Sequence, residues 1–140
     1  IQSCAEHPVT GRVISIHSVR AASEALDTLQ RFDMPHNSTC IFHWFSGTSD
    51  ELARARALGC YFSVNARMLA TKRGREYARQ IPLDKLLLET DAPKELGDPG
   101  DAQALAGELT QTLDVLDDIR KERKELLAGS ISQTSQELLG

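Results

Sequence analysis

Residues 39–65 read TCIFHWFSGTSDELARARALGCYFSVN, and this stretch decides the fold. It begins with a short apolar run at 39–45 and ends with a second one at 60–65, both rich in residue types that favour β-strands. The residues between them fit a helix that is bounded by turn signals. The stretch therefore predicts one strand–helix–strand unit.

The ends of the intervening helix carry specific signals. A turn is predicted at Ser46 and Gly47, and Thr48 and Glu51 have the spacing of a capping box at a helix start. Gly59 predicts the helix end, because glycine readily takes the left-handed conformation found there.

Similar units lie on both sides of this stretch. Strands are predicted to begin near residues 12, 39, 60 and 85, which gives about one βα unit every 20 to 30 residues. This repeat is typical of a parallel sheet with helical crossovers, so the predicted fold class is α/β. The predicted strands are 12–17, 39–45, 60–65 and 85–90, with helices around 22–32 and 71–80.

The last third of the chain reads as helical. After a loop at 97–100, leucines and one isoleucine between 105 and 119 recur on one helical face. The mixed charges at 120–125 predict a solvated helix surface. Ser132 is a candidate cap for a final short helix that reaches Gly140.

Composition limits the function classes. With 140 residues, 41% of them hydrophobic, the chain suits a single domain over 1–140, and its net charge of −4 argues against coating nucleic acid by bulk positive charge. No segment is long and apolar enough to predict a membrane span, and no secretion signal is visible. Cys4, Cys40 and Cys60 are odd in number and lack CxxC spacing, which favours a reducing, cytoplasmic setting.

Polar residues follow three of the predicted strands. His17, His43 and Asp91 lie at or just past strand ends, where the loops of a parallel sheet bind ligands. Two imidazoles and one carboxylate suit zinc or another divalent transition metal. Glu89 lies two residues before Asp91, so both side chains point to one face of an extended strand. One could bind metal while the other takes a hydrogen bond or a proton.

Simpler interpretations compete with a metal site. A single histidine at a strand end is more often satisfied by a backbone group, and the ligand spacing is not a motif by itself. Among the basic residues after the third strand, Arg67 and Lys72 are the better candidates for phosphate binding, although an exposed helix face is an equal alternative. Trp44 and Phe45 are predicted to be core residues rather than a base-stacking platform.

Four segments together resemble a known family. Residues 16–20 (IHSVR), 43–47 (HWFSG), 59–63 (GCYFS) and 86–93 (LLLETDAP) resemble, in order, the second half of TatD-like metal-dependent hydrolases. Trp44 stands where many members carry Cys, and in this it is similar to the subgroup found in Qat-type anti-phage defence clusters.

The resemblance implies a (β/α)8 barrel of the amidohydrolase type that holds one or two divalent metals (Zn, Mg or Mn) and hydrolyses phosphodiester bonds in DNA. It implies that His17, His43 and Asp91 bind metal and that Asp91 also helps to activate the attacking water. Positions that contact substrate or orient the ligands are implied for Arg20, Ser46, Lys72 and Glu89.

The chain also departs from the family pattern. Such a barrel typically needs about 250 residues, and the early His-x-His strand and the bridging Glu of the family have no counterpart here. The expectation is therefore the last four βα units plus closing helices, a half-barrel that needs an amino-terminal half or a second chain. We favour missing upstream sequence over a truncated product. A catalytically incomplete half-barrel that acts as a binding or regulatory module, and a small flavodoxin-like domain that binds a phosphorylated ligand, are the alternatives.

Overall fold

The computed structural model describes residues 1–7, 9–90 and 102–139. Its centre is a four-stranded parallel sheet in the order β1-β2-β3-β4. The strands are β1 (Arg12–Ile16), β2 (Ser38–His43), β3 (Tyr61–Val64) and β4 (Leu86–Leu88). The predicted α/β class and the parallel sheet are confirmed.

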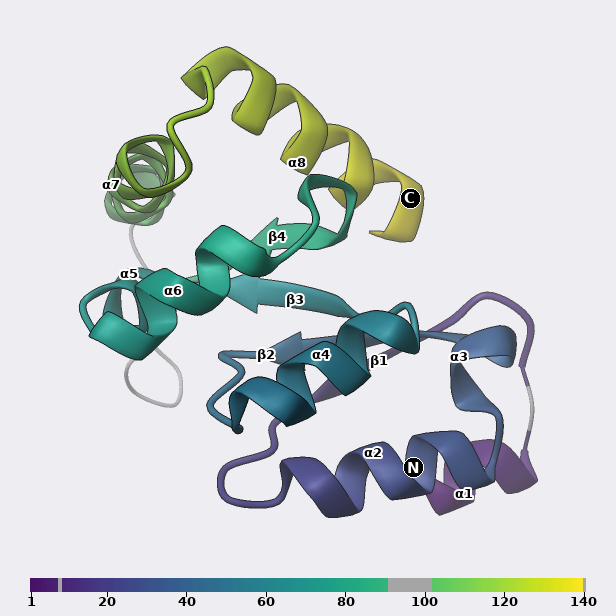
Figure 1. Ribbon diagram of the computed structural model, residues 1–140. Helices are drawn as coiled ribbons and strands as arrows, with labels where there is room; N and C mark the ends of the chain where they lie inside the picture. Colours follow the sequence, from purple (N-terminus) through teal and green to yellow (C-terminus); the bar gives the residue numbers. More distant parts are fainter. Residues whose placement is uncertain (8, 91–101, 140) are drawn as a thin grey trace.

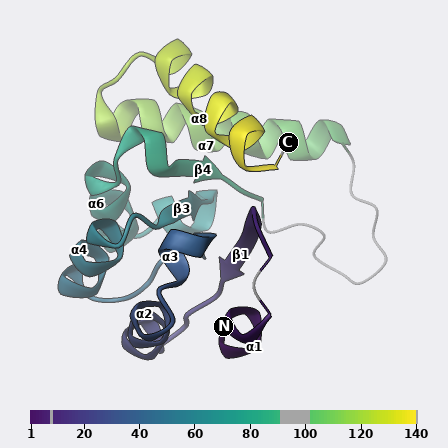
Figure 2. The same cartoon turned by 90° about the vertical axis from the view of Figure 1, so that its right-hand side faces the viewer.

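Helices cover one face of this sheet. As Figures 1 and 2 show, α2 (Ala22–Arg31), α4 (Ser49–Ala57) and α6 (Lys72–Gln80) lie side by side along it. The long helices α7 (Ala102–Arg120) and α8 (Lys124–Leu139) pack on each other and against β4. The short elements are α1 (Gln2–Glu6), α3 (Met34–Asn37), α5 (Ala66–Leu69) and the 3-10 turn η1 (Leu83–Lys85).

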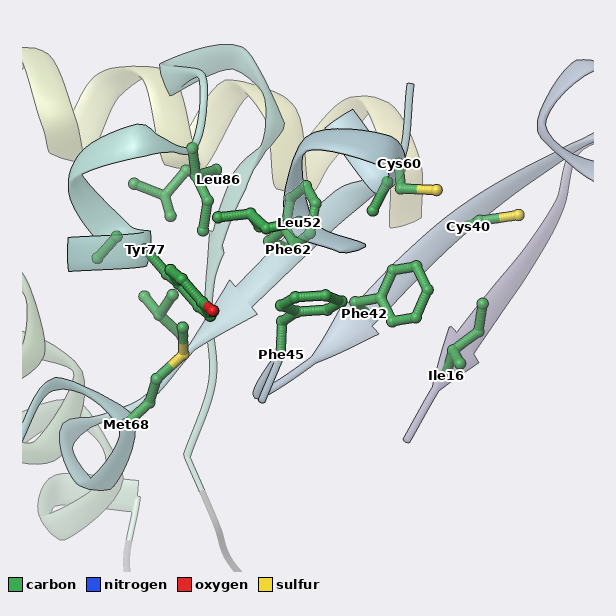
Figure 3. Close-up of a cluster of buried hydrophobic side chains, with 14 of the residues drawn as sticks. Ile16, Cys40, Phe42, Phe45, Leu52, Cys60, Phe62, Met68, Tyr77 and Leu86 are labelled. Atoms are coloured by element: carbon green, nitrogen blue, oxygen red, sulfur yellow. The ribbon is translucent and has the colours of Figure 1, made fainter. Parts of the chain in front are cut away.

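The strand register separates a core row from a polar row. Phe42 pairs with Phe62, and Phe62 pairs with Leu86; all three side chains are fully buried. Figure 3 shows this row, with Phe45 packed edge-on against Phe42 at a ring distance of 5.3 Å. The next row pairs His43 with Ser63 and Ser63 with Leu87. Because side chains alternate between the faces of a sheet, the polar row faces away from the helices that cover the core.

Two of the three free thiols belong to the interior. Cys40 and Cys60 are buried, and burial raises the pKa of Cys40 to about 11 and that of Cys60 to about 12. Both therefore remain neutral at physiological pH and act as small apolar side chains.

The helix signals around α4 are confirmed. Thr48 and Glu51 form both hydrogen bonds of the capping box, and Gly59 has φ +78° just after the helix. These signals act within a few residues, which is why the sequence suffices to predict them.

Three local predictions need correction. The strand predicted over 39–45 ends at His43, because Trp44 takes φ +43° and turns the chain. Ser132 is not a cap but lies inside α8, which already begins at Lys124. Arg120 is not solvated: its guanidinium donates to the carbonyl oxygens of Ala78 (2.8 Å) and Ile81 (2.6 Å) and ties α7 to α6.

No helix of the described part of the chain is long and apolar enough to cross a bilayer.

Candidate metal centre and nucleic-acid site

The carboxyl ends of the parallel strands bring the predicted site residues together. His17 follows β1, His43 is the last residue of β2, and Glu89 follows β4. The Glu89 backbone N–H donates to the Val64 carbonyl at 3.0 Å, so the ladder continues one step past β4. Residues far apart in sequence therefore share one edge of the sheet, as the strand-end argument predicts for His17 and His43.

The Glu89 carboxylate organises this edge. Its Oε2 accepts hydrogen bonds from Nδ1 of His43 and Oγ of Ser63, and its Oε1 accepts one from Nδ2 of Asn65 at 2.8 Å. The Glu89 side chain is only 13% exposed. Because an ionised carboxylate can only accept, Nδ1 of His43 is the donor, and in a neutral ring Nε2 then keeps its lone pair. This tautomer would allow His43 to bind a metal through Nε2.

The two histidine rings have a spacing that suits a shared ion. The ring centres of His17 and His43 are 5.2 Å apart, and the rings are tilted by 39°. Imidazoles bound to one tetrahedral Zn²⁺ at about 2.1 Å have centres about 5 Å apart. The pair and its carboxylate partner thus fit a divalent transition metal in both chemistry and spacing.

The set of ligands is incomplete within residues 1–7, 9–90 and 102–139, where no three His, Cys, Asp or Glu side chains are grouped closely enough to hold a metal ion. Asp91, predicted as a metal ligand and a catalytic residue, lies outside the described residues. Its role stays a prediction.

Two members of the cluster are absent from the sequence-based set of candidates. Ser63 and Asn65 are both buried polar residues on or next to β3. Asn65 has a second task, since its Oδ1 accepts from the Met68 N–H at 2.8 Å and caps α5. The available signal was the pair of polar residues inside the apolar run 60–65, because a buried polar side chain needs a partner.

Arg20 and Ser46 line a cavity of about 320 Å³, which Ser18, the residue after His17, also lines. The cavity wall at Gly47 has no space for a side chain, since a Cβ there would lie 2.5 Å from Oε2 of Glu51. Tyr77 Oη donates to the Gly47 carbonyl at 2.6 Å and holds this part of the wall. Hydrogen bonds from Ser23 and then Thr48 lower the pKa of Glu51, which is therefore anionic at neutral pH.

The other two basic candidates, Arg67 and Lys72, differ in whether they line a cavity. Arg67 lines a second cavity, of about 220 Å³, together with Asn65 and Glu89. Lys72 is exposed at the first position of α6 and lines neither cavity, whereas its neighbour Arg73 lines the cavity of Arg20. The structure thus adds Arg73 to the cations near the site.

Comparison with known proteins places these features in a family. Residues 5–140 match the family described as TatD related DNase. The chain belongs to this family. It is 38% identical over 80 residues to the Deoxyribonuclease Tat-D of Schizosaccharomyces pombe, a match that covers 56% of the chain and 25% of that relative. It is 40% identical over 63 residues to the 3′-5′ ssDNA/RNA exonuclease TatD of Pantoea vagans, with 43% and 24% covered.

Solved structures extend the likeness to nearly the whole chain. YJJV, a TatD homologue from Escherichia coli K12, matches with a TM-score of 0.72 and 26% identity over 90% of this chain and 49% of its own. A TatD family hydrolase from Entamoeba histolytica matches with a TM-score of 0.78 over 98% of this chain and 53% of its own. At 14% identity the latter shows the fold alone. The chain thus matches about a quarter of the length of the curated relatives and about half that of the solved structures.

Proposed function

We propose that this chain supplies the carboxyl-terminal half of a metal-dependent active site that hydrolyses phosphodiester bonds in DNA. The observation that carries the proposal is the convergence of His17, His43 and Glu89 at one end of a parallel sheet. The names of its relatives, a deoxyribonuclease and an ssDNA/RNA exonuclease, support the reaction class.

The residues have distinct roles in this proposal. His17 and His43 would hold a divalent ion, Zn, Mg or Mn, and Asp91 would add a carboxylate ligand. A bound divalent ion lowers the pKa of its water and shields the phosphate charge. Glu89 hydrogen-bonds to Nδ1 of the His43 ring and would also take a proton from water at this edge. Arg20, Ser46, Arg67 and Lys72 would orient the DNA backbone.

The proposal includes a partner for the sheet. In the described residues β1 and β4 each pair on one side only, whereas a closed barrel has no free edges. The amino-terminal half of the barrel, or a second chain, would pair with these strands and add the remaining metal ligands. Matches that cover about half of the solved structures support this arrangement.

The proposal also includes the cellular compartment and the subgroup of the protein. Three free cysteines, two of them buried, fit the cytoplasm. Trp44 within HWFSG supports the assignment to the Qat-type anti-phage subgroup.

A second candidate function is a binding or regulatory half-barrel without catalysis. The observation in its favour is that the described residues offer two imidazoles but no group of three metal-ligating side chains.

Histidine variants of the protein with its amino-terminal half supplied separate these functions. We expect His43→Ala to lower DNA hydrolysis by orders of magnitude, because it removes a metal ligand and the partner of Glu89. Asp91→Asn should do the same. His36→Ala is the matched control, since His36 is exposed and its side chain hydrogen-bonds only to Asp33 among the described residues. Near-normal hydrolysis by His43→Ala, with the fold retained, would refute the assignment of the active site to the histidine pair. No hydrolysis by the native protein would favour the binding or regulatory half-barrel.

A further inference from the structure

An apolar cavity adjoins the histidine pair. Its volume is about 330 Å³, and it is lined by His17, Val19, Trp44 and Ser46. This volume is at the lower end of the range of small-ligand sites, which starts at about 300 Å³. A cavity of this size beside the candidate metal centre can take one ring system.

Trp44 reaches this cavity through an unusual backbone conformation. Its φ of +43° is uncommon for a bulky residue, and its N–H donates to the Ser63 carbonyl at 3.2 Å, which holds the turn in place. The turn returns Phe45 to the core, where it is 2% exposed, and leaves Trp44 only half-buried. Trp44 is predicted to be a core residue; in the structure it packs against the core but is only partly buried. Strained residues of this kind concentrate at ligand sites.

Val19 makes the cavity more apolar. It is 59% exposed, one of three large hydrophobic side chains that are exposed in the described part of the chain. Such exposure beside a half-buried tryptophan is consistent with a surface that an apolar, flat group covers.

Cations line a neighbouring cavity. Ser46 lines both this cavity and the one that contains Arg20 and Arg73. Neither guanidinium has an ion pair or side-chain hydrogen bond to another described residue. Glu24 and Glu51 line the arginine cavity too, but Glu51 is engaged by Ser23 and Thr48. Free guanidinium groups favour phosphate, which they can bind in a bidentate manner.

Ser46 therefore lies between the apolar cavity, which His17 also lines, and the cavity of the two arginines. We infer that Trp44 and Val19 form a subsite for one unpaired base of a DNA strand, whose neighbouring phosphate is bound by Arg20 and Arg73. The inference rests on the proposed function for the identity of the polymer. A base inside a duplex is stacked on both faces and is not free to enter, so the subsite selects single strands.

Trp44 is the only tryptophan of the 140-residue chain, so the difference in fluorescence between the native protein and Trp44→Phe reports this subsite. Both proteins, with the amino-terminal half supplied, are titrated in EDTA with oligothymidylate, with an abasic strand of equal length, and with a blunt duplex. We expect oligothymidylate to quench Trp44 fluorescence, and the abasic strand and the duplex to cause little quenching. Equal quenching by the abasic strand, or none by oligothymidylate, would overturn the inference.

Variants give an independent measurement by anisotropy of a labelled oligothymidylate. Trp44→Ala should weaken binding about tenfold, as expected when one base no longer stacks on an aromatic ring. Trp44→Phe should bind within about threefold of the native chain, because an aromatic face remains. Leu126→Ala, at a residue 62% exposed on α8, is the matched control and should bind normally. Native affinity in Trp44→Ala would contradict the subsite.

These measurements need no hydrolysis, so they separate the two proposals. Base-dependent quenching in a protein that never cleaves DNA supports the subsite and counts against the nuclease. Cleavage of single strands by a protein that shows no quenching supports the nuclease and overturns the subsite.

Discussion

Two polar regions lie at the carboxyl end of the sheet and differ in how their charged groups are satisfied. Around Glu89, three side chains from β2, β3 and the turn before α5 donate to one carboxylate. In the cavity of Arg20 and Arg73, neither guanidinium has a partner among the described residues. The first region is organised by the protein itself, whereas the second presents charge to whatever enters.

The difference indicates that the two regions have different functions. A half-buried carboxylate with several donors fixes the orientation of His43 before any ligand arrives, which is what a metal centre requires. Exposed arginines are hydrated in the free protein, so they can exchange water for phosphate at little cost. Loss of a group in the first region should therefore change the chemistry, and loss of a group in the second should change affinity.

Glu89→Gln should have the largest effect. The amide keeps the size of the side chain but removes the charge that fixes the His43 tautomer, so metal affinity should fall by about 10- to 100-fold, with a matching loss of hydrolysis. Metal competition titrations and kcat at saturating metal measure both effects. Glu108→Gln is the control, because Glu108, on α7, lines the cavity of about 220 Å³ that Glu89 also lines. If Glu89→Gln kept native metal affinity, Glu89 would not position the ligand.

Arg20→Ala and Arg73→Ala should have an intermediate effect that is confined to binding. Each should weaken DNA binding and reduce the slope of log K against log salt by about 1 for each phosphate that the variant no longer binds, while kcat stays unchanged. Binding isotherms over a range of salt concentrations measure this slope. Arg79→Ala removes a cation that already pairs with Glu76 on α6, and it should leave the slope unchanged. A fall in kcat without a change in slope would mean that the arginines contribute to the chemical step rather than to DNA binding.

Thr48→Ala should have the smallest effect. It removes one half of the capping box of α4, which costs about 1 kcal/mol of unfolding free energy. Urea denaturation measures the loss. Thr28→Ala is a suitable comparison, since that hydroxyl donates only to the Glu24 carbonyl inside α2. A loss no greater than that of Thr28→Ala would mean that the cap is not stabilising.

The sequence was most informative where the physical signal is local. The capping box at Thr48 and the left-handed Gly59 depend on residues a few positions apart, and both predictions are confirmed. The proximity of His17 and His43 followed from a general rule on strand ends, so it needed only the strand order.

The rest depends on tertiary structure. Ser63 and Asn65 matter because Glu89 follows the neighbouring strand and accepts their hydrogen bonds, which residue spacing alone does not reveal. The turn at Trp44 is set by packing of Phe45 against Phe42 and by a bond to another strand. Ser132 is not a cap because α8 already begins at Lys124, and its packing against α7 and β4 is not visible from the residues next to Ser132.

The proposed site requires that His17 and His43 bind one cation. This is tested by the metal affinity of the barrel completed with its amino-terminal half, measured for the native protein and for His17→Ala, His43→Ala and His36→Ala. We predict that the first two variants each lose at least about tenfold in affinity and that His36→Ala binds like the native protein. Native affinity in both His17→Ala and His43→Ala would contradict the claim.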